Sequence, residues 1–186
     1  PNGTIIGDFC IGCEGPVHSV LLISDVPLES IRTIRLDYQS RTSVRLVRLL
    51  AEQRWNIFPV WESASKGFED EITGTTAAVV IGDRAMAARK KHNFVYDLGE
   101  EWNRMTNLPF VFAVWVANKA LPNGFAEKFN RALNHGIGSI SALTENIERD
   151  FASREEIQTY LTEQIRYEFG DRQREGLELL LKLLDS

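Results

Sequence analysis

Short apolar runs alternate with amphipathic stretches along most of this chain, and the pattern becomes helical after Gly124. Three apolar runs predict buried strands, at Val17–Ser24, Ala77–Ile81 and Phe110–Val116. A shorter alternation of apolar and charged positions at Ile34–Asp37 predicts a further strand. Strands that alternate with helices are typical of an α/β fold, which is the fold class that we expect.

The helices are predicted by apolar residues at helical spacing and by their end signals. One helix is expected to begin at Ser40–Ser43, and a short helix is expected at Gly99–Thr106 with Trp102 on its buried side. Phenylalanine and leucine every four residues after Gly124 predict a helix that stops at Gly136. Ser153 and Glu156 have the spacing of a capping box, which predicts another helix start.

Composition and charge exclude several classes of protein. Apolar residues make up 44% of the 186 residues and charged residues 25%, which is ordinary for a globular domain. The net charge is −5 and no basic cluster stands out, so we expect no nucleic-acid partner. No apolar run approaches the roughly 20 residues of a membrane-spanning helix, so we expect no membrane partner. Two cysteines cannot staple a fold of this size, which favours a reduced, cytoplasmic setting.

The segment Ser40–Ser43 brings three hydroxyls and the Arg41 guanidinium to the start of a predicted helix. Such a start leaves backbone N–H groups unpaired and carries a partial positive charge, which suits a carboxylate or a phosphate. The alternative is that Ser40 only caps the helix and Arg41 lies on the surface. One hydroxyl is enough for a cap, so those of Thr42 and Ser43 are in excess. We therefore expect this segment to bind an anion.

Gly82 and Asp83 follow the predicted strand Ala77–Ile81, and ligands of open α/β folds lie beyond the carboxyl ends of strands. Glycine allows a ligand to approach the backbone closely. Asp83 could accept a hydrogen bond from a substrate hydroxyl, or it could cap the next helix, which is the commoner role of such a residue.

No metal or cofactor is expected. Cys10 and Cys13 lack the second cysteine pair that a zinc site needs, and the three histidines have no Ser-His-Asp or Cys-His context. The glycine-rich fingerprints of nucleotide-binding loops are absent from the sequence.

Longer segments resemble a known family. They are LDYQSRTSVRLVRLL (36–50), VIGDRAM (80–86) and YDLGEEWNRMTNLPFVFAVWV (96–116), with CIGCEGPVHSVLLIS (10–24) and YLTEQIRYEFG (160–170) extending the match. Together they resemble the chorismate dehydratases of the futalosine route to menaquinone. A sibling family, 1,4-dihydroxy-6-naphthoate synthase, shares part of the third segment. That family typically has a His-Glu pair where this chain has Gly82-Asp83, which favours the dehydratase.

The resemblance implies a two-lobed fold like that of type II periplasmic binding proteins. On that pattern, residues 1–24 are the remainder of lobe one and the first crossing strand, and residues 25–109 are lobe two. Residues 110–186 are the second crossing strand, Phe110–Val116, and helices that return to lobe one. The first crossing strand is then Val17–Ser24. The resemblance also implies that the N-terminal part of lobe one is missing from this chain.

The activity that the resemblance implies is loss of water from chorismate, with no cofactor. The substrate-binding residues are then expected to be Ser40, Arg41, Thr42, Ser43, Gly82 and Gly15. Asp83 is the expected catalytic residue, although Glu14 and a carboxylate of the substrate are alternatives for the base. A non-enzymatic solute-binding module of the same fold is a further alternative.

Overall fold

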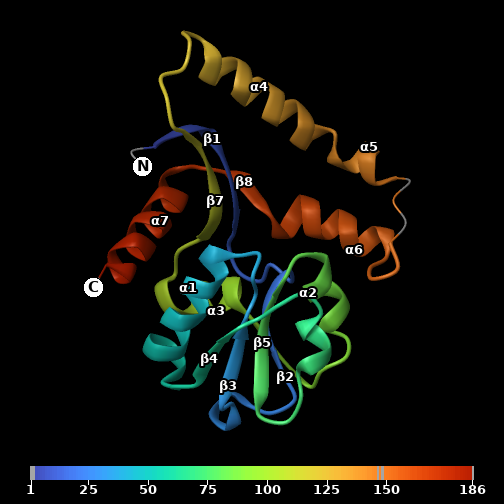
Figure 1. Ribbon diagram of the computed structural model, residues 1–186. Helices are drawn as coiled ribbons and strands as arrows, with labels where there is room; N and C mark the ends of the chain where they lie inside the picture. Colours follow the sequence, from blue (N-terminus) through green and yellow to red (C-terminus); the bar gives the residue numbers. More distant parts are fainter. Residues whose placement is uncertain (1–2, 146, 148, 186) are drawn as a thin grey trace.

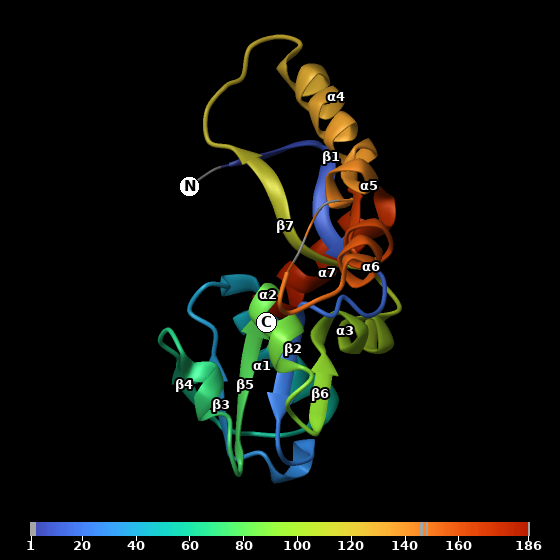
Figure 2. The ribbon, with the colours of Figure 1, turned by 90° about the vertical axis from the view of Figure 1, so that its right-hand side faces the viewer.

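Five strands form one mixed sheet, in the order β4-β3-β5-β2-β6 (Figures 1 and 2). The computed structural model describes residues 3–145, 147 and 149–185. The strands are β2 (Val20–Ser24), β3 (Thr33–Leu36), β4 (Val60–Ser63), β5 (Thr76–Ile81) and β6 (Phe94–Asp97). β3 runs parallel to β4 and β5, whereas β2 runs antiparallel to β5 and β6. The carboxyl ends of β3, β5 and β6 therefore meet at one edge of the sheet, where β2 begins.

Helices cover both faces of this sheet, which explains why its central strands are continuously apolar. Leu22 and Val79 pack in one cluster with apolar residues of α1 (Arg41–Leu50) and with Trp102 of α3 (Leu98–Thr106). On the other face, Leu21 and Val80 pack with α2 (Asp83–Ala88) and with Phe68 of the 3-10 helix η3 (Phe68–Glu71). Trp102 is fully buried, as its place in the predicted helix required.

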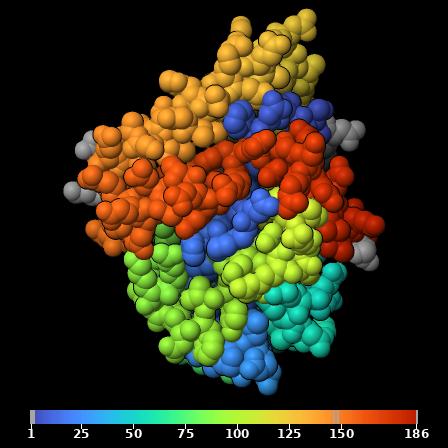
Figure 3. Space-filling model, turned by 180° about the vertical axis from the view of Figure 1, so that it is seen from behind, coloured from blue at the N-terminus to red at the C-terminus, as the bar shows by residue number. Residues whose placement is uncertain are grey.

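A second, smaller sheet is antiparallel, in the order β7-β1-β8. Its strands are β1 (Thr4–Cys13), β7 (Phe110–Ala117) and β8 (Arg166–Glu168). The remaining helices are α4 (Phe125–Gly138), α5 (Ile140–Thr144), α6 (Arg154–Thr159) and α7 (Asp171–Leu184). The views from the side and from behind show this sheet and these helices on one side of the five-stranded sheet, with the C-terminal residues as a band across the back (Figures 2 and 3).

The expected pair of crossing strands is corrected by this arrangement. The strand predicted at Val17–Ser24 begins only at Val20 and lies wholly inside the five-stranded sheet, and β7 pairs with β1 instead. The cause is Asp97, whose carboxylate accepts hydrogen bonds from the backbone N–H groups of Val17 (2.9 Å) and His18 (2.6 Å). His18 has a φ of 60°, in the left-handed region, so the chain turns there and cannot continue as a strand.

The end of α4 differs from the sequence pattern by two residues. α4 runs past Gly136 to Gly138. The capping box of Ser153 and Glu156 is present at the start of α6. Within the described part of the chain, no helix has both the length and the apolar character needed to cross a membrane.

Glu101 links its own helix, α3, to the helical turn that follows α1 on the same face of the sheet. Its carboxylate accepts hydrogen bonds from Arg54 Nε (2.5 Å), Trp55 Nε1 (2.9 Å) and Arg104 Nη1 (2.8 Å). Arg54 and Trp55 belong to a π-helical turn, η2 (Ala51–Trp55), that extends α1. Burial acts to raise the pKa of Glu101, but the hydrogen bonds from Trp55 and Arg54 outweigh burial and lower it.

We predict that Glu101→Gln lowers the free energy of unfolding at neutral pH by about 1–3 kcal/mol, because hydrogen bonds to a charged group are lost. Since the pKa of Glu101 is lowered in the folded state, this stabilisation is present above the ordinary glutamate pKa and is lost as the pH falls through the folded value. Urea titrations from neutral to acid pH should therefore show the two stability curves converging. The control is Glu100→Gln, whose ion pair with Arg104 is exposed. Equal midpoints for the two variants at neutral pH would contradict the prediction.

Candidate active site

The two segments singled out in the sequence lie at the same edge of the five-stranded sheet. Ser40–Ser43 follows β3 and Gly82–Asp83 follows β5, and these two strands are parallel neighbours. Gly82 N–H donates to the carbonyl of Ser19 (2.7 Å), just before β2 begins. Gly82 has a φ of 64° and a ψ of −145°, a backbone conformation that favours glycine. Both segments therefore lie beyond strand carboxyl ends, as was expected for Gly82 and Asp83.

Two of the three hydroxyls at the start of α1 are used by the protein itself. The Ser40 hydroxyl accepts a hydrogen bond from the Ser43 backbone N–H (3.0 Å) and donates one to the Ser43 hydroxyl (2.8 Å). Ser43 is buried. The capping alternative therefore accounts for Ser40 and Ser43. No described residue forms a hydrogen bond with the Thr42 hydroxyl. Of the three hydroxyls, that of Thr42 is therefore the one that capping does not account for.

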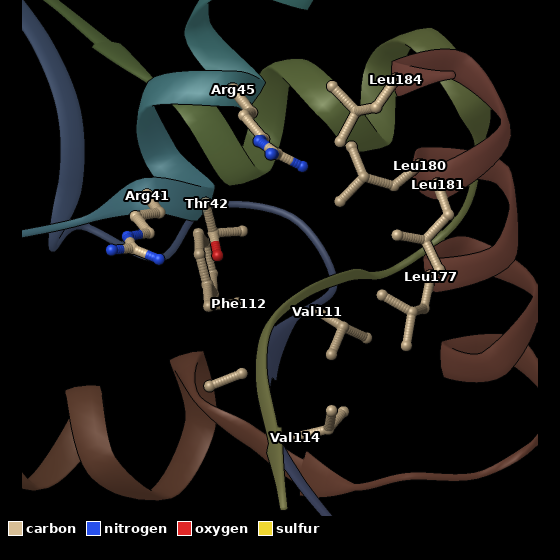
Figure 4. Close-up of a pocket in the computed structure, with 11 residues that line it drawn as sticks. Arg41, Thr42, Arg45, Val111, Phe112, Val114, Leu177, Leu180, Leu181 and Leu184 are labelled. Atoms are coloured by element: carbon tan, nitrogen blue, oxygen red, sulfur yellow. The ribbon is translucent and has the colours of Figure 1, made fainter. Parts of the chain in front are cut away.

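Thr42 borders a cavity of about 350 Å³ between α1, β7 and α7. Figure 4 shows Arg41, Thr42 and Arg45 of α1 on one side of it and four leucines of α7 on the other. Its lining residues are Arg41, Thr42, Arg45, Val111, Phe112, Ala113, Val114, Leu177, Leu180, Leu181 and Leu184. A hydroxyl and two guanidiniums facing apolar walls suit a ligand that has both a carboxylate and an apolar body.

Asp83 lies on a different cavity, of about 170 Å³, which Tyr160 also lines. The Tyr160 hydroxyl lies 3.0 Å from the Ser19 hydroxyl, at hydrogen-bonding distance. Burial is the main cause that raises the pKa of Tyr160, and the charge of Asp83 adds to the rise. Asp83 and Thr42 thus share a sheet edge but line different cavities.

Gly15 and Glu14 lie in the turn between β1 and β2. Gly15 has a φ of 104°, and a Cβ atom there would meet no atom within 4 Å. The Glu14 carboxylate pairs with Arg172 of α7 at 2.9 Å. Of the two protein candidates for the base, Glu14 is therefore held by a guanidinium, whereas Asp83 has no ion pair among the described residues.

Asp37 and Arg84 connect the two segments, although neither was among the site residues predicted from the sequence. The Asp37 side chain is fully buried, and its Oδ2 accepts from the backbone N–H of Ile81 (3.2 Å). Arg84 Nη2 lies 2.7 Å from Asp37 Oδ2 and 3.0 Å from Oδ1, and Arg84 Nη1 donates to Glu69. Gln39 N–H donates to Asp37 Oδ1 (2.9 Å). The sequence signal was a carboxylate and a guanidinium, each within three residues of the end of a parallel strand.

The cysteines are buried and unpaired, and neither of them lines these cavities. Burial raises the pKa of the Cys10 thiol to about 11 and raises that of Cys13 as well. Both thiols are therefore protonated at neutral pH, which makes them poor nucleophiles and poor metal ligands. No cluster of three or more potential metal-binding His, Cys, Asp or Glu side chains occurs in the described ranges.

Comparisons with known proteins extend over nearly the whole chain. A family model described as menaquinone biosynthesis matches residues 2–186. A curated protein of Thermus thermophilus named chorismate dehydratase is 26% identical over 199 residues, which cover 97% of this chain and 73% of the relative. The crystal structure of protein AF1704 from Archaeoglobus fulgidus is similar, with a TM-score of 0.65 at 16% identity over 97% of this chain and 71% of that chain. This last likeness shows a shared fold.

We predict that Arg84→Met lowers the free energy of unfolding by about 3–5 kcal/mol, because it leaves the buried Asp37 carboxylate without its counter-ion. Adding Asp37→Asn should recover part of this loss, since the unpaired charge is then removed. Urea denaturation of the single and double variants measures both effects. The control is Arg172→Met, which breaks an exposed ion pair and should cost no more than about 1 kcal/mol. A similar loss for Arg84→Met and Arg172→Met would show that the Asp37 pair contributes little.

Proposed function

The chain belongs to the menaquinone biosynthesis family, and we propose that it is a chorismate dehydratase, a carbon–oxygen lyase. The reaction converts chorismate to 3-[(1-carboxyvinyl)oxy]benzoate and water. The observation that carries the proposal is the match to a chorismate dehydratase across 97% of this chain. The cavity beside Thr42 supports it, because chorismate combines carboxylates with a ring.

The proposal includes a two-lobed fold like that of type II periplasmic binding proteins. Residues 25–109 hold four of the five strands of the larger sheet, which supports a second lobe there, and β2 extends this lobe to include Val20–Ser24. The smaller sheet and helices α4 to α7 then belong to lobe one and to the connection between the lobes. The edge at which β3, β5 and β6 end faces this connection, where a cleft between lobes would lie.

The chemistry needs position and charge more than it needs a cofactor. The ring carbon that bears the ether loses its proton, the neighbouring carbon loses its hydroxyl, and the electrons of the broken C–H bond complete an aromatic ring. Aromatisation supplies the driving force. The N-terminus of α1, with the Thr42 hydroxyl and Arg41, would neutralise a substrate carboxylate and the charge that develops as the C–H bond breaks.

We assign to Asp83 one of two roles, either proton transfer or binding of the hydroxyl that leaves. It lies at the carboxyl end of β5, in the first turn of α2, and has no ion pair within the described ranges that would neutralise it. Tyr160 lines the same cavity, and its hydroxyl, whose pKa is raised further by burial, can donate a hydrogen bond there. Closure of the lobes around the substrate would bring the two cavities together and exclude water.

We predict that the purified chain consumes chorismate and releases the dehydrated benzoate, detected by mass spectrometry and proton NMR. Asp83→Asn should lower kcat by about 10²–10⁴-fold, the usual contribution of a positioned acid or base. Asp70→Asn, on η3, is the control for loss of a carboxylate elsewhere and should keep the wild-type rate. A wild-type chain that leaves chorismate unchanged would contradict the proposed reaction, and an unaltered rate in Asp83→Asn would contradict the role of Asp83.

We predict that Thr42→Val lowers kcat/KM for chorismate about ten- to hundredfold, which corresponds to loss of a hydrogen bond to a charged group worth about 1.5–3 kcal/mol. Valine keeps the shape of threonine, and the Thr42 hydroxyl makes no hydrogen bond within the described part of the protein, so the melting temperature should stay the same. Ser40→Ala is the matched control, because it removes the cap of α1 and should lower stability by about 1 kcal/mol. Unchanged kinetics in Thr42→Val would mean that its hydroxyl does not contact the substrate.

A further inference from the structure

The cavity between α1 and α7 contains a second cation, Arg45, which lies outside the Ser40–Ser43 segment. Arg41 and Arg45 are four residues apart on α1 and therefore lie on the same face of the helix. Both line the cavity, and Figure 4 shows both guanidiniums on its α1 side. Within the described ranges, neither forms an ion pair or donates a side-chain hydrogen bond. Two like charges at this spacing repel each other, so a bound anion would stabilise the pair.

The wall opposite these arginines is apolar. Leu177, Leu180, Leu181 and Leu184 come from α7, and Val111 and Val114 come from β7. Leu180 is buried, whereas Leu181 remains 51% exposed. Phe112 lies below Thr42 in Figure 4. A ring placed between the leucines and Phe112 would remove apolar surface from water without burying any of the polar groups on α1.

The next arginine of α1 provides an internal comparison. The Arg48 guanidinium stacks on the Trp61 ring, with 4.8 Å between Arg48 Cζ and the ring centroid, and lines a different hollow. It shares the helix and the charge of Arg45 but not the cavity. Effects that depend only on the net charge of α1 must appear at both positions, whereas effects of the cavity must appear at Arg45 alone.

We propose that this cavity binds a cyclic dicarboxylate through two separate cations. Arg41 and Thr42 hold one carboxylate, Arg45 holds the second, and the α7 leucines with Phe112 contact the ring. This inference rests on the proposed function and adds to it the residue that recognises the second carboxylate. A volume of about 350 Å³ suits a single-ring ligand, at the lower end of the usual range for ligand pockets. The site therefore selects dicarboxylates over monocarboxylates, and it accepts aromatic rings that cannot react.

The test uses two unreactive probes, isophthalate with two carboxylates on one benzene ring and benzoate with one. Calorimetric titration of the full chain at low salt should show that isophthalate binds about tenfold more tightly than benzoate, the scale of one charged hydrogen bond. Arg45→Met should abolish this preference and leave benzoate binding unchanged. Arg48→Met, the matched control, should keep the preference. Arg45→Lys keeps the positive charge and should therefore retain part of the preference for isophthalate.

Each outcome decides a separate question. Equal preferences in Arg45→Met and Arg48→Met, or no preference in the wild-type chain, would overturn the assignment of Arg45. In turnover assays, the assignment predicts a KM for chorismate that rises about tenfold in Arg45→Met with little change in kcat. Turnover with an unchanged KM in this variant would overturn the assignment and leave the proposed reaction standing. If isophthalate binding depends on Arg45 but the chain does not dehydrate chorismate, the assignment of Arg45 is supported and the proposed reaction is overturned.

Discussion

The carboxylate of Asp37 is the group on which the geometry of the candidate site depends. It is completely buried at the end of β3, yet it contacts the backbone of β5 through Ile81 and the side chain of Arg84 in α2. A buried charge is tolerated only when it is paired and hydrogen-bonded, so these partners cannot move independently. The turn before α1 and the turn before α2 are thereby held at a fixed separation, which is what two substrate-contacting segments require.

Asp97 performs a related task where the chain enters the five-stranded sheet. Its carboxylate accepts from the backbone of Val17 and His18 on one side and of Gly99 and Glu100 on the other. The same group therefore turns the chain before β2 and caps α3. Burial is the first cause of its raised pKa, and the hydrogen bonds from the backbone of His18, Glu100 and Val17 offset part of this effect. Asp97 hydrogen-bonds only backbone groups and Asp37 hydrogen-bonds both backbone groups and Arg84, whereas Asp83 has no ion pair among the described residues.

Much of the larger sheet and of its helices could be predicted from the sequence, and the reasons are local. Val79 and Val80 belong to a run with apolar residues on both faces, and Ser153 with Glu156 carries its own capping signal. β1 and β8 were harder to predict, because their residues are partly exposed and their pairing is decided by distant partners. At the site, the positions of Thr42 and Asp83 followed from strand ends. The roles of Ser40 and Ser43 as mutual partners, and the link through Arg84, depend on rotamers and on tertiary contacts that no local pattern contains.

The smaller sheet joins parts of the chain that are far apart in sequence. β1 pairs Thr4 with Ala117 and Cys13 with Phe110, and β8 adds Phe9 with Glu168. Closing loops of this length costs conformational entropy before any pairing is gained, so we expect such contacts to form late in folding. The five-stranded sheet contains shorter connections and can assemble earlier. A partly folded chain would then hold Asp37, Arg84 and Thr42 in place while β7 and α7 were still unattached, and it would have no cavity in which to bind a substrate.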